Sequence, residues 1–210
     1  DMKGSKENKG NVHGHIVRVA QGNPWDTAFK WDIYLFASEA DADKARVNLS
    51  NLTDENDLSS PDGLVFSEAT GLCWIQTDDG AYTDKTNCML LAAIPGTVGD
   101  GSKRTLSYKR ADGSEKRVDT YVGKAQTPST LKRFLVGPVD CEITGLCETP
   151  DGKALFINIQ HPGEGTKMAD VGNPAKYTSQ WPANAGYGVG NRPRSATIVI
   201  TKVDGGQIGS

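Results

Sequence analysis

The stretch "CEITGLCETPDGKALFINIQHPGE", residues 141–164, decides the fold that we predict for this chain. Two short apolar segments of β-strand character flank the tight reversal "PDGK", and Glu142 stands where the first segment begins. A partial echo lies upstream in "SSPDGLVFSEATGLCWIQTDDG", residues 59–80, where Asp62 takes the corresponding place. The echo predicts two equivalent hairpins, each with a carboxylate at the start of its first strand.

The remaining sequence alternates short apolar runs with turn signals, and sustained helical periodicity is scarce. The best helix candidate is Glu39–Leu49, and residues 161–194 form a long stretch without a strand pattern, which we expect to be a loop insertion. Eleven strands are therefore expected in one all-β unit spanning residues 1–210. Their expected ranges are His13–Ala20, Lys30–Ala37, Gly63–Ser67, Leu72–Thr77, Cys88–Ile94, Arg104–Lys109, Lys116–Val122, Leu131–Val136, Ile143–Glu148, Ala154–Ile159 and Ala196–Lys202.

The two hairpins favour a β-propeller with four-stranded antiparallel blades, and two similar hairpins in a sandwich are the alternative. In a propeller the innermost strand of each blade lines a central channel, so carboxylates at equivalent strand starts converge. Converging carboxylates repel one another unless cations lie between them, and calcium prefers such all-oxygen ligand sets. The fold prediction thus leads to a metal site formed by Asp62 and Glu142.

Composition excludes several classes of function. The 210 residues carry a formal net charge of −3 with scattered Lys and Arg, which gives no sign of a nucleic-acid surface. No apolar run approaches the roughly 18 residues that a membrane span needs. The four cysteines form no C-x-x-C pair or common zinc pattern. Cys73 and Cys147 fall in strand patterns and are interpreted as core residues, and a disulfide in an exported protein stays open.

Three segments carry a resemblance to a known family: "SSPDGLVF…LCWIQTDDG", "RFLVGPVDCEITGLCETPDGKALFINIQHPGE" and "RPRSATIVI". Together with "GHIVRV…NPWDTAFKWDIYLFA" they resemble the C-terminal half of PhoX-type alkaline phosphatases, over almost the whole chain. The resemblance implies an exported monomeric propeller enzyme that hydrolyses phosphate esters with calcium and iron (Ca²⁺ and Fe³⁺). It further implies that this chain is a C-terminal portion, with a twin-arginine export signal and the cysteine ligand of iron lying upstream.

Four residues are the candidates for the site. The resemblance supports Glu142 and Asp62 as metal ligands, although each could instead be a turn carboxylate that binds a local amide. His161 in "NIQHPGE" could ligate iron, transfer a proton or anchor the loop. Arg194 stands just before the last strand and could bind phosphoryl oxygens through its bidentate guanidinium, with a loop salt bridge as the alternative.

The function expected from these residues is phosphate-ester hydrolysis by a metal cluster, with this chain weak or inactive alone. A lactonase-like calcium-dependent propeller and a non-catalytic binding propeller are the alternatives. The expected partners are a phosphomonoester substrate and the N-terminal half of the same protein, or a second copy of the fragment. The resemblance places the protein in the bacterial periplasm or outside the cell.

Overall fold

The computed structural model shows two compact units within the chain. One unit combines Asp1–Pro61 with Pro95–Lys132, and the other combines Asp62–Ile94 with Arg133–Ser210. The residues that the structure describes are 11–79, 85–110, 112–183 and 191–210. The expectation that residues 1–210 form one all-β unit stays a prediction.

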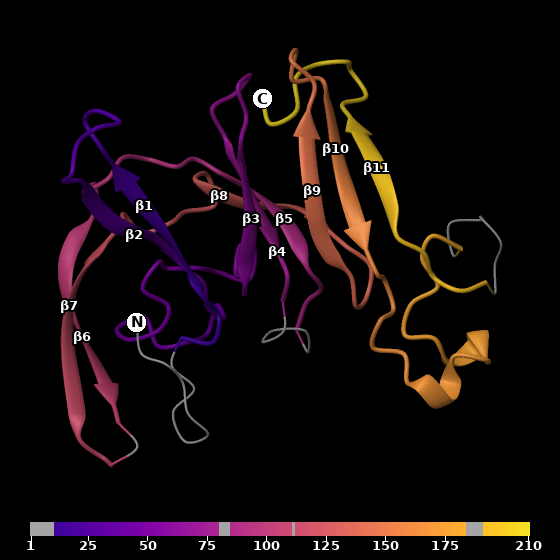
Figure 1. Ribbon diagram of the computed structural model, residues 1–210, viewed down its shortest axis with the longest axis horizontal. Helices are drawn as coiled ribbons and strands as arrows, with labels where there is room; N and C mark the ends of the chain where they lie inside the picture. Colours follow the sequence, from indigo (N-terminus) through magenta and orange to yellow (C-terminus); the bar gives the residue numbers. More distant parts are fainter. Residues whose placement is uncertain (1–10, 80–84, 111, 184–190) are drawn as a thin grey trace. The chain divides into compact units, whose positions relative to one another are not determined.

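Strands dominate both units, as Figure 1 shows. Every strand expected from the sequence is present, with its ends shifted by at most two residues. Alternating apolar side chains specify strands such as β10 and β11, whereas β4 and β5 are short, almost fully buried runs. The all-β prediction is therefore confirmed. The strands are β1 (His15–Ala20), β2 (Lys30–Phe36), β3 (Pro61–Phe66), β4 (Cys73–Thr77), β5 (Met89–Ala93), β6 (Ser102–Lys109), β7 (Glu115–Val122), β8 (Leu131–Val136), β9 (Glu142–Glu148), β10 (Ala154–Gln160) and β11 (Ala196–Thr201).

The helix expected over Glu39–Leu49 is absent, and this prediction was wrong; the segment consists of turns. The side chain of Asn48 makes hydrogen bonds with backbone groups in and beside this segment. Asn48 Nδ2 donates to the carbonyl oxygens of Ala40 and Leu52, and Asn48 Oδ1 accepts from the Leu52 amide. Asn48 is buried, so its side chain fixes the folded loop and competes with helix formation.

The first unit contains a four-stranded sheet in the order β1-β2-β7-β6. Strands β1 and β2 are antiparallel, with one extra residue in β2 where Ile16 pairs with Leu35 and Val17 pairs with Ile33. Strands β6 and β7 form an antiparallel hairpin, whereas β2 and β7 pair in parallel through Ile33 and Val122. The sheet therefore has the expected four strands, with one parallel pair among them.

The second unit contains a four-stranded sheet, β3-β4-β5-β8, and a three-stranded sheet, β11-β10-β9. Its buried cluster is centred on Trp74 and on alternate residues of β10, namely Leu155, Ile157 and Ile159. Phe156 lies between them in sequence and is 38% exposed, whereas its sequence counterpart Trp74 is fully buried. The echo thus predicts the strands correctly, but the aligned aromatic residues differ in burial.

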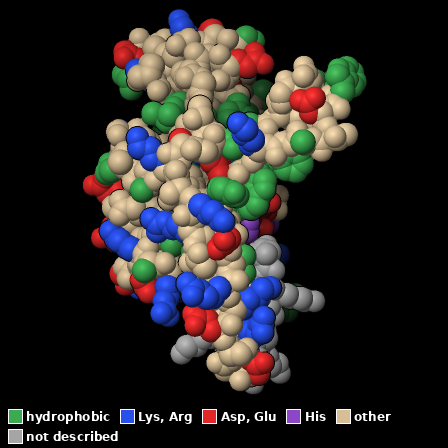
Figure 2. All heavy atoms as spheres, turned by 90° about the vertical axis from the view of Figure 1, so that its left-hand side faces the viewer, with side chains coloured by type: hydrophobic (Ala, Val, Ile, Leu, Met, Phe, Trp, Pro, Cys, Tyr) green, Lys and Arg blue, Asp and Glu red, His purple; other side chains and the backbone are tan. Residues whose placement is uncertain are grey.

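Figure 2 shows Lys and Arg side chains gathered over the lower part of one face, interspersed with Asp and Glu. Four cationic residues with exposed side chains are described on strands β6 and β7 of the first unit, and Lys103 Nζ lies 2.8 Å from Asp119 Oδ2. Both side chains are more than half exposed, so this ion pair stabilises the hairpin only weakly. The four are Lys103, Arg104, Lys116 and Arg117.

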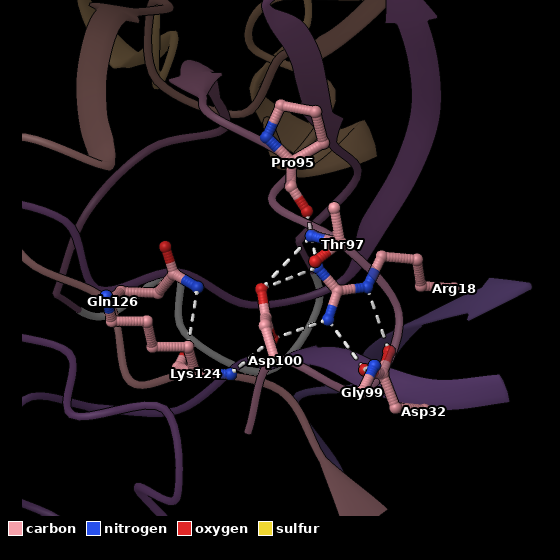
Figure 3. Close-up of polar contacts among 8 residues, drawn as sticks. All are labelled: Arg18, Asp32, Pro95, Thr97, Gly99, Asp100, Lys124 and Gln126. Atoms are coloured by element: carbon pink, nitrogen blue, oxygen red, sulfur yellow. Dashed lines mark hydrogen bonds and ion pairs between the residues drawn. The ribbon is translucent and has the colours of Figure 1, made fainter.

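A buried ion-pair network fixes β1, β2 and the loop before β6 within the first unit (Figure 3). Arg18 Nε and Nη2 donate to the two carboxylate oxygens of Asp32 at 2.9 and 2.6 Å. The Gly99 amide donates to the same carboxylate at 2.7 Å, and Arg18 Nη1 donates to the carbonyl oxygen of Pro95. Asp32 is 1% exposed, so these donors replace the water that its charge would otherwise require.

Asp100 is the second carboxylate of this network. It accepts from Arg18 Nη2 at 2.8 Å and from the backbone amides of Lys124 at 3.0 Å and Thr97 at 3.1 Å. The hydrogen bond from Arg18 is the main reason why the pKa of Asp100 falls to about 2.

This pKa predicts an acid-dependent loss of stability. Because the folded-state pKa of Asp100 lies below its ordinary value of 3.8, the ionised carboxylate stabilises the fold above about pH 4. That contribution is lost as the pH falls through about 2. An Asp100→Asn variant is expected to be less stable than wild type at neutral pH, with the difference shrinking toward pH 2. Urea unfolding across this range measures it, and a constant difference would contradict the assignment.

Candidate functional site

Glu142 is the first residue of β9, and a β-bulge sets the direction of its side chain. Strands β9 and β10 pair Leu146 with Ile157 and Thr144 with Asn158, which leaves Gly145 as the extra residue. Gly145 has a φ of +38°, and a Cβ atom there would collide with the Asn158 side chain, so the bulge requires glycine. Because a bulge changes the face that residues on one side of it occupy relative to those on the other, Gly145 determines where Glu142 points.

Two residues at the end of β10 contact the Glu142 carboxylate. Gln160 Nε2 donates to Glu142 Oε2 at 2.7 Å, and the bulged register pairs these two residues directly. His161 Nε2 lies 3.5 Å from the same oxygen, and the Glu142 side chain is 12% exposed. One carboxylate oxygen is thus shared between an amide and an imidazole at the end of the hairpin.

His161 is held by its backbone where the strand turns into the following loop. It has a φ of +36°, and its amide donates to Ser195 Oγ at 2.9 Å, beside the start of β11. Its Nδ1 atom lies 3.2 Å from Glu164 Oε2, an electrostatic contact rather than an aligned hydrogen bond. The imidazole therefore lies between two carboxylates and can carry a proton between them.

The surroundings of Glu142 raise its pKa above the ordinary value. Burial is the largest cause, and the negative charges of Asp78 and Asp62 raise the pKa further, while His161 lowers it. The repulsion from Asp62 indicates that this residue, 80 positions earlier in the sequence, lies near Glu142 in the folded unit. That the two carboxylates converge on one metal site stays a prediction.

The position of Asp62 follows from the packing between β3, β4 and β9. A Cβ atom on Gly63 would collide with the side chain of Gln76 in β4, so the two strands approach closely beside Asp62. Gln76 Nε2 in turn donates to the carbonyl oxygen of Ile143 at 3.4 Å, next to Glu142. The buried Gln76 side chain therefore links the strand of Asp62 to that of Glu142.

The electrostatic contact can be tested through the pKa of Glu142. Asp62→Asn removes one of the repelling charges, so the pKa of Glu142 is expected to fall toward its ordinary value. An Asp151→Asn variant is the matched control, because Asp151 binds Thr149 and Lys153 locally and is not among the residues that shift the pKa of Glu142. Side-chain carbon NMR across a pH titration measures the change. An unaltered pKa in Asp62→Asn would contradict the proximity.

Arg194 does not join these side chains through any contact among the described residues. Its backbone amide donates to the carbonyl oxygen of Trp181 at 3.1 Å, and its side chain is exposed. Arg192, rather than Arg194, borders a cavity of about 250 Å³ together with Glu164, Tyr177 and Pro193. Glu164 thus stands between His161 and this cavity, which lies in the 161–194 segment.

Comparisons with known proteins identify the family of this chain. A family model described as "Alkaline phosphatase PhoX" matches residues 1–163 of the chain. This chain belongs to the PhoX family. A solved structure, Pseudomonas fluorescens PhoX in complex with vanadate, a transition state analogue, is similar at a TM-score of 0.62 and 29% identity. The match covers 94% of this chain and 28% of that protein, and a search of curated proteins found no match.

The side chains near Glu142 can hold a metal ion only if they offer the ligand atoms that the ion prefers. Carboxylate oxygens are the ligands that calcium prefers, so Glu142 and Asp62 are of the right type. Within the described ranges, however, no group of three or more His, Cys, Asp or Glu side chains is arranged to hold a metal ion. The two carboxylates are thus of the type that calcium takes, but the described residues do not by themselves make up a metal site.

Among the described residues, no cysteine belongs to a group of His, Cys, Asp or Glu side chains arranged to hold a metal ion. Burial raises the pKa of Cys73 to about 11 and that of Cys141 to about 12, and it also raises the pKa of Cys88, so all three remain thiols. Cys147, which the sequence suggested to be a core residue, is exposed on β9. The core interpretation is correct for Cys73 and wrong for Cys147.

Sequence reasoning missed Gln160 and Asp78 as neighbours of Glu142. If residues of β9 and β10 are paired one by one outward from the Asp151-Gly152 turn, Gln160 falls opposite Ile143. This regular pairing leaves out the extra residue in β9. Only the bulge at Gly145 brings Gln160 opposite Glu142. A glycine inside a strand pattern was the available signal for this bulge. Asp78 follows β4 directly and had the weaker signal of a carboxylate at a strand end.

Proposed function

We propose that this chain contributes to the active site of a phosphoric monoester hydrolase. The observation that carries the proposal is the Glu142–His161–Glu164 cluster, with Asp62 and Asp78 near enough to raise the pKa of Glu142. The cluster lies in a PhoX-family chain whose solved relative binds vanadate as a transition state analogue. Carboxylates that repel one another at a single place are suited to binding cations and hence phosphate.

In this proposal Glu142 and Asp62 bind Ca²⁺, and Fe³⁺ is held by ligands outside this chain. When bound, such metal ions neutralise the phosphoryl charge and lower the pKa of a coordinated water. Gln160 fixes one oxygen of Glu142 through its 2.7 Å hydrogen bond. His161 lies 3.5 Å from Glu142 Oε2 through Nε2, and it is proposed to exchange a proton with Glu164, whose Oε2 lies 3.2 Å from Nδ1.

The two arginines before β11 are proposed to bind the substrate, with different support. Arg194 was expected from its sequence position, and its exposed guanidinium is available to phosphoryl oxygens. Arg192 has the additional support that it borders the cavity next to Glu164. Loss of phosphate affinity in Arg194→Ala but not in Arg192→Ala would favour the first assignment, and the reverse result would favour the second.

The active enzyme is proposed to be longer than this chain, because the match spans only 28% of the solved relative. Exposed apolar side chains on β1, β2 and β7 offer a surface for further β-sheets of such a protein. Trp31 packs edge-on against Tyr121 there, and both rings are more than 40% exposed. The other large apolar residues exposed on these strands are Val17 and Val19.

The location of the protein in the bacterial periplasm or outside the cell, after twin-arginine export, is likewise proposed from the family. In the described residues no helix is long and apolar enough to cross a membrane. Self-association of the 210-residue chain is the alternative to covering by further sheets of the same polypeptide. Sedimentation of the isolated chain separates the two, since a monomeric fragment would argue against self-association.

The test of the proposed function compares this chain with a full-length protein that contains it. With p-nitrophenyl phosphate, calcium and iron, the full-length protein is expected to turn over substrate, and the isolated chain to be weak or inactive. Glu142→Gln in the full-length protein is expected to abolish turnover, whereas Asp151→Asn, whose carboxylate serves a local turn, is expected to retain it. Full activity in Glu142→Gln would overturn the proposal.

A further inference from the structure

Two buried cysteines of the second unit lie at the starts of strands that contact each other. Cys88 directly precedes β5, Cys141 directly precedes β9, and β5 packs against β9. Both belong to the buried cluster that contains Trp74, and they are 4% and 5% exposed. Neither takes part in the proposed chemistry, so their proximity calls for a separate explanation.

Gly137 shows how near the two cysteines lie. Its amide donates to the carbonyl oxygen of Cys88 at 2.9 Å. A Cβ atom added to Gly137 would collide with Cys141 Sγ and would lie 3.3 Å from that same Cys88 carbonyl oxygen. The Sγ atom of Cys141 and the backbone of Cys88 therefore border one small space, which exists because residue 137 has no side chain.

We infer that Cys88 and Cys141 form a disulfide bond when the protein folds under oxidising conditions. The structure holds both as thiols, with Cys88 Sγ accepting from the Asp79 amide at 3.0 Å. The proposed bond requires the Cys88 side chain to rotate away from that amide, so that its sulfur can reach Cys141. This side-chain rotation replaces a weak sulfur acceptor with a covalent bond, and it leaves the β-strand pairing in place.

The bond forms before the cluster closes, since burial keeps both thiols protonated afterwards. Burial, and after it the neighbouring Cys88, raises the pKa of Cys141 to about 12. In the open chain, a cysteine thiolate attacks a small disulfide such as oxidised glutathione and releases one glutathione thiolate. The second cysteine then displaces the other glutathione, so two thiols are oxidised while one glutathione disulfide is reduced to two thiols.

The cross-link has a direct consequence for the candidate site, because Cys141 precedes Glu142. It would fix the start of β9 to the start of β5 and close a long loop of chain between them. The position of the Glu142 carboxylate would then depend on a covalent tie as well as on the bulge at Gly145. The inference itself is independent of whether the site hydrolyses phosphate esters.

The test is a thiol count on the whole chain, refolded from denaturant with glutathione disulfide or with a reductant. Of the four cysteines, two are expected to react with a thiol reagent after oxidative refolding and unfolding, and four after reductive refolding. Peptide mapping is expected to join Cys88 to Cys141. The oxidised form is expected to melt roughly 5 to 10 °C above the reduced form.

Serine variants provide the matched controls. Cys88→Ser and Cys141→Ser should each leave three reactive thiols after oxidative refolding, whereas Cys147→Ser and Cys73→Ser should each leave one. Should a serine variant not fold, the wild-type count and peptide map still decide. Four reactive thiols in oxidatively refolded protein with a native circular dichroism spectrum would overturn the inference, as would a bond to Cys73 or Cys147.

Discussion

Replacing Trp74 with alanine is expected to lower the free energy of unfolding by about 3–5 kcal/mol, the range for large aromatic residues removed from a core. Trp74 is 0% exposed in β4, and its ring packs edge-on against Phe134 at 4.9 Å between centroids. The substitution removes these contacts and leaves a cavity among Leu90, Ile143 and Leu155. Urea unfolding followed by circular dichroism gives the loss.

Trp25 supplies the matched control for Trp74, since the same substitution there removes a side chain that is 87% exposed. Trp25→Ala is expected to change the free energy of unfolding by less than about 0.5 kcal/mol. Similar losses in both variants would contradict the packing described for β4, because burial is what distinguishes the two positions.

Replacing Asp32 with alanine is expected to destabilise the protein by about 3–5 kcal/mol, the cost of breaking a buried ion pair from one side. The variant leaves two of the Arg18 donors and the Gly99 amide without their acceptor, in a place that is closed to water. Asp100 still faces Arg18, so part of the charge remains compensated. Urea unfolding of the variant at neutral pH gives the loss.

The exposed ion pair on β6 and β7 is the control for this second prediction. Asp119→Ala removes a carboxylate 2.8 Å from Lys103 Nζ, and its cost is expected to be about 0–1 kcal/mol. Comparable losses of unfolding free energy in Asp32→Ala and Asp119→Ala would show that burial of the Arg18 network adds nothing to the stability of the protein. A larger cost for Asp32→Ala at low and high salt alike supports the network, because buried charges are poorly screened.

Strands could be predicted from this sequence because their pattern is local. In β10 the buried residues alternate with exposed ones, and an Asp-Gly turn precedes the strand, so position and type both follow from neighbouring residues. The helix expected over residues 39–49 failed for the opposite reason. The side chain of Asn48 bonds to backbone groups up to eight residues away, and periodicity carries no information about such bonds.

The candidate site was predictable only where the sequence repeats itself. Asp62 and Glu142 came from the echo between two hairpins, and the raised pKa of Glu142 supports their proximity. Gln160 depended on a bulge that shifts the register by one residue, which a pattern of period two does not reveal. Asp100 meets Arg18 across 82 positions, and only the folded topology brings such distant residues together.

The division of the first unit into two separate chain segments has a consequence for synthesis on the ribosome. Strands β1 and β2 emerge early and pair with each other, yet the second partner of β2 is β7, which ends at residue 122, after β3, β4 and β5 have been made. The nascent hairpin therefore waits with one hydrogen-bonding edge open, a state that invites pairing with other chains. Slowing translation between residues 62 and 94 should raise the yield of aggregates, and a chaperone that shields extended segments should lower it.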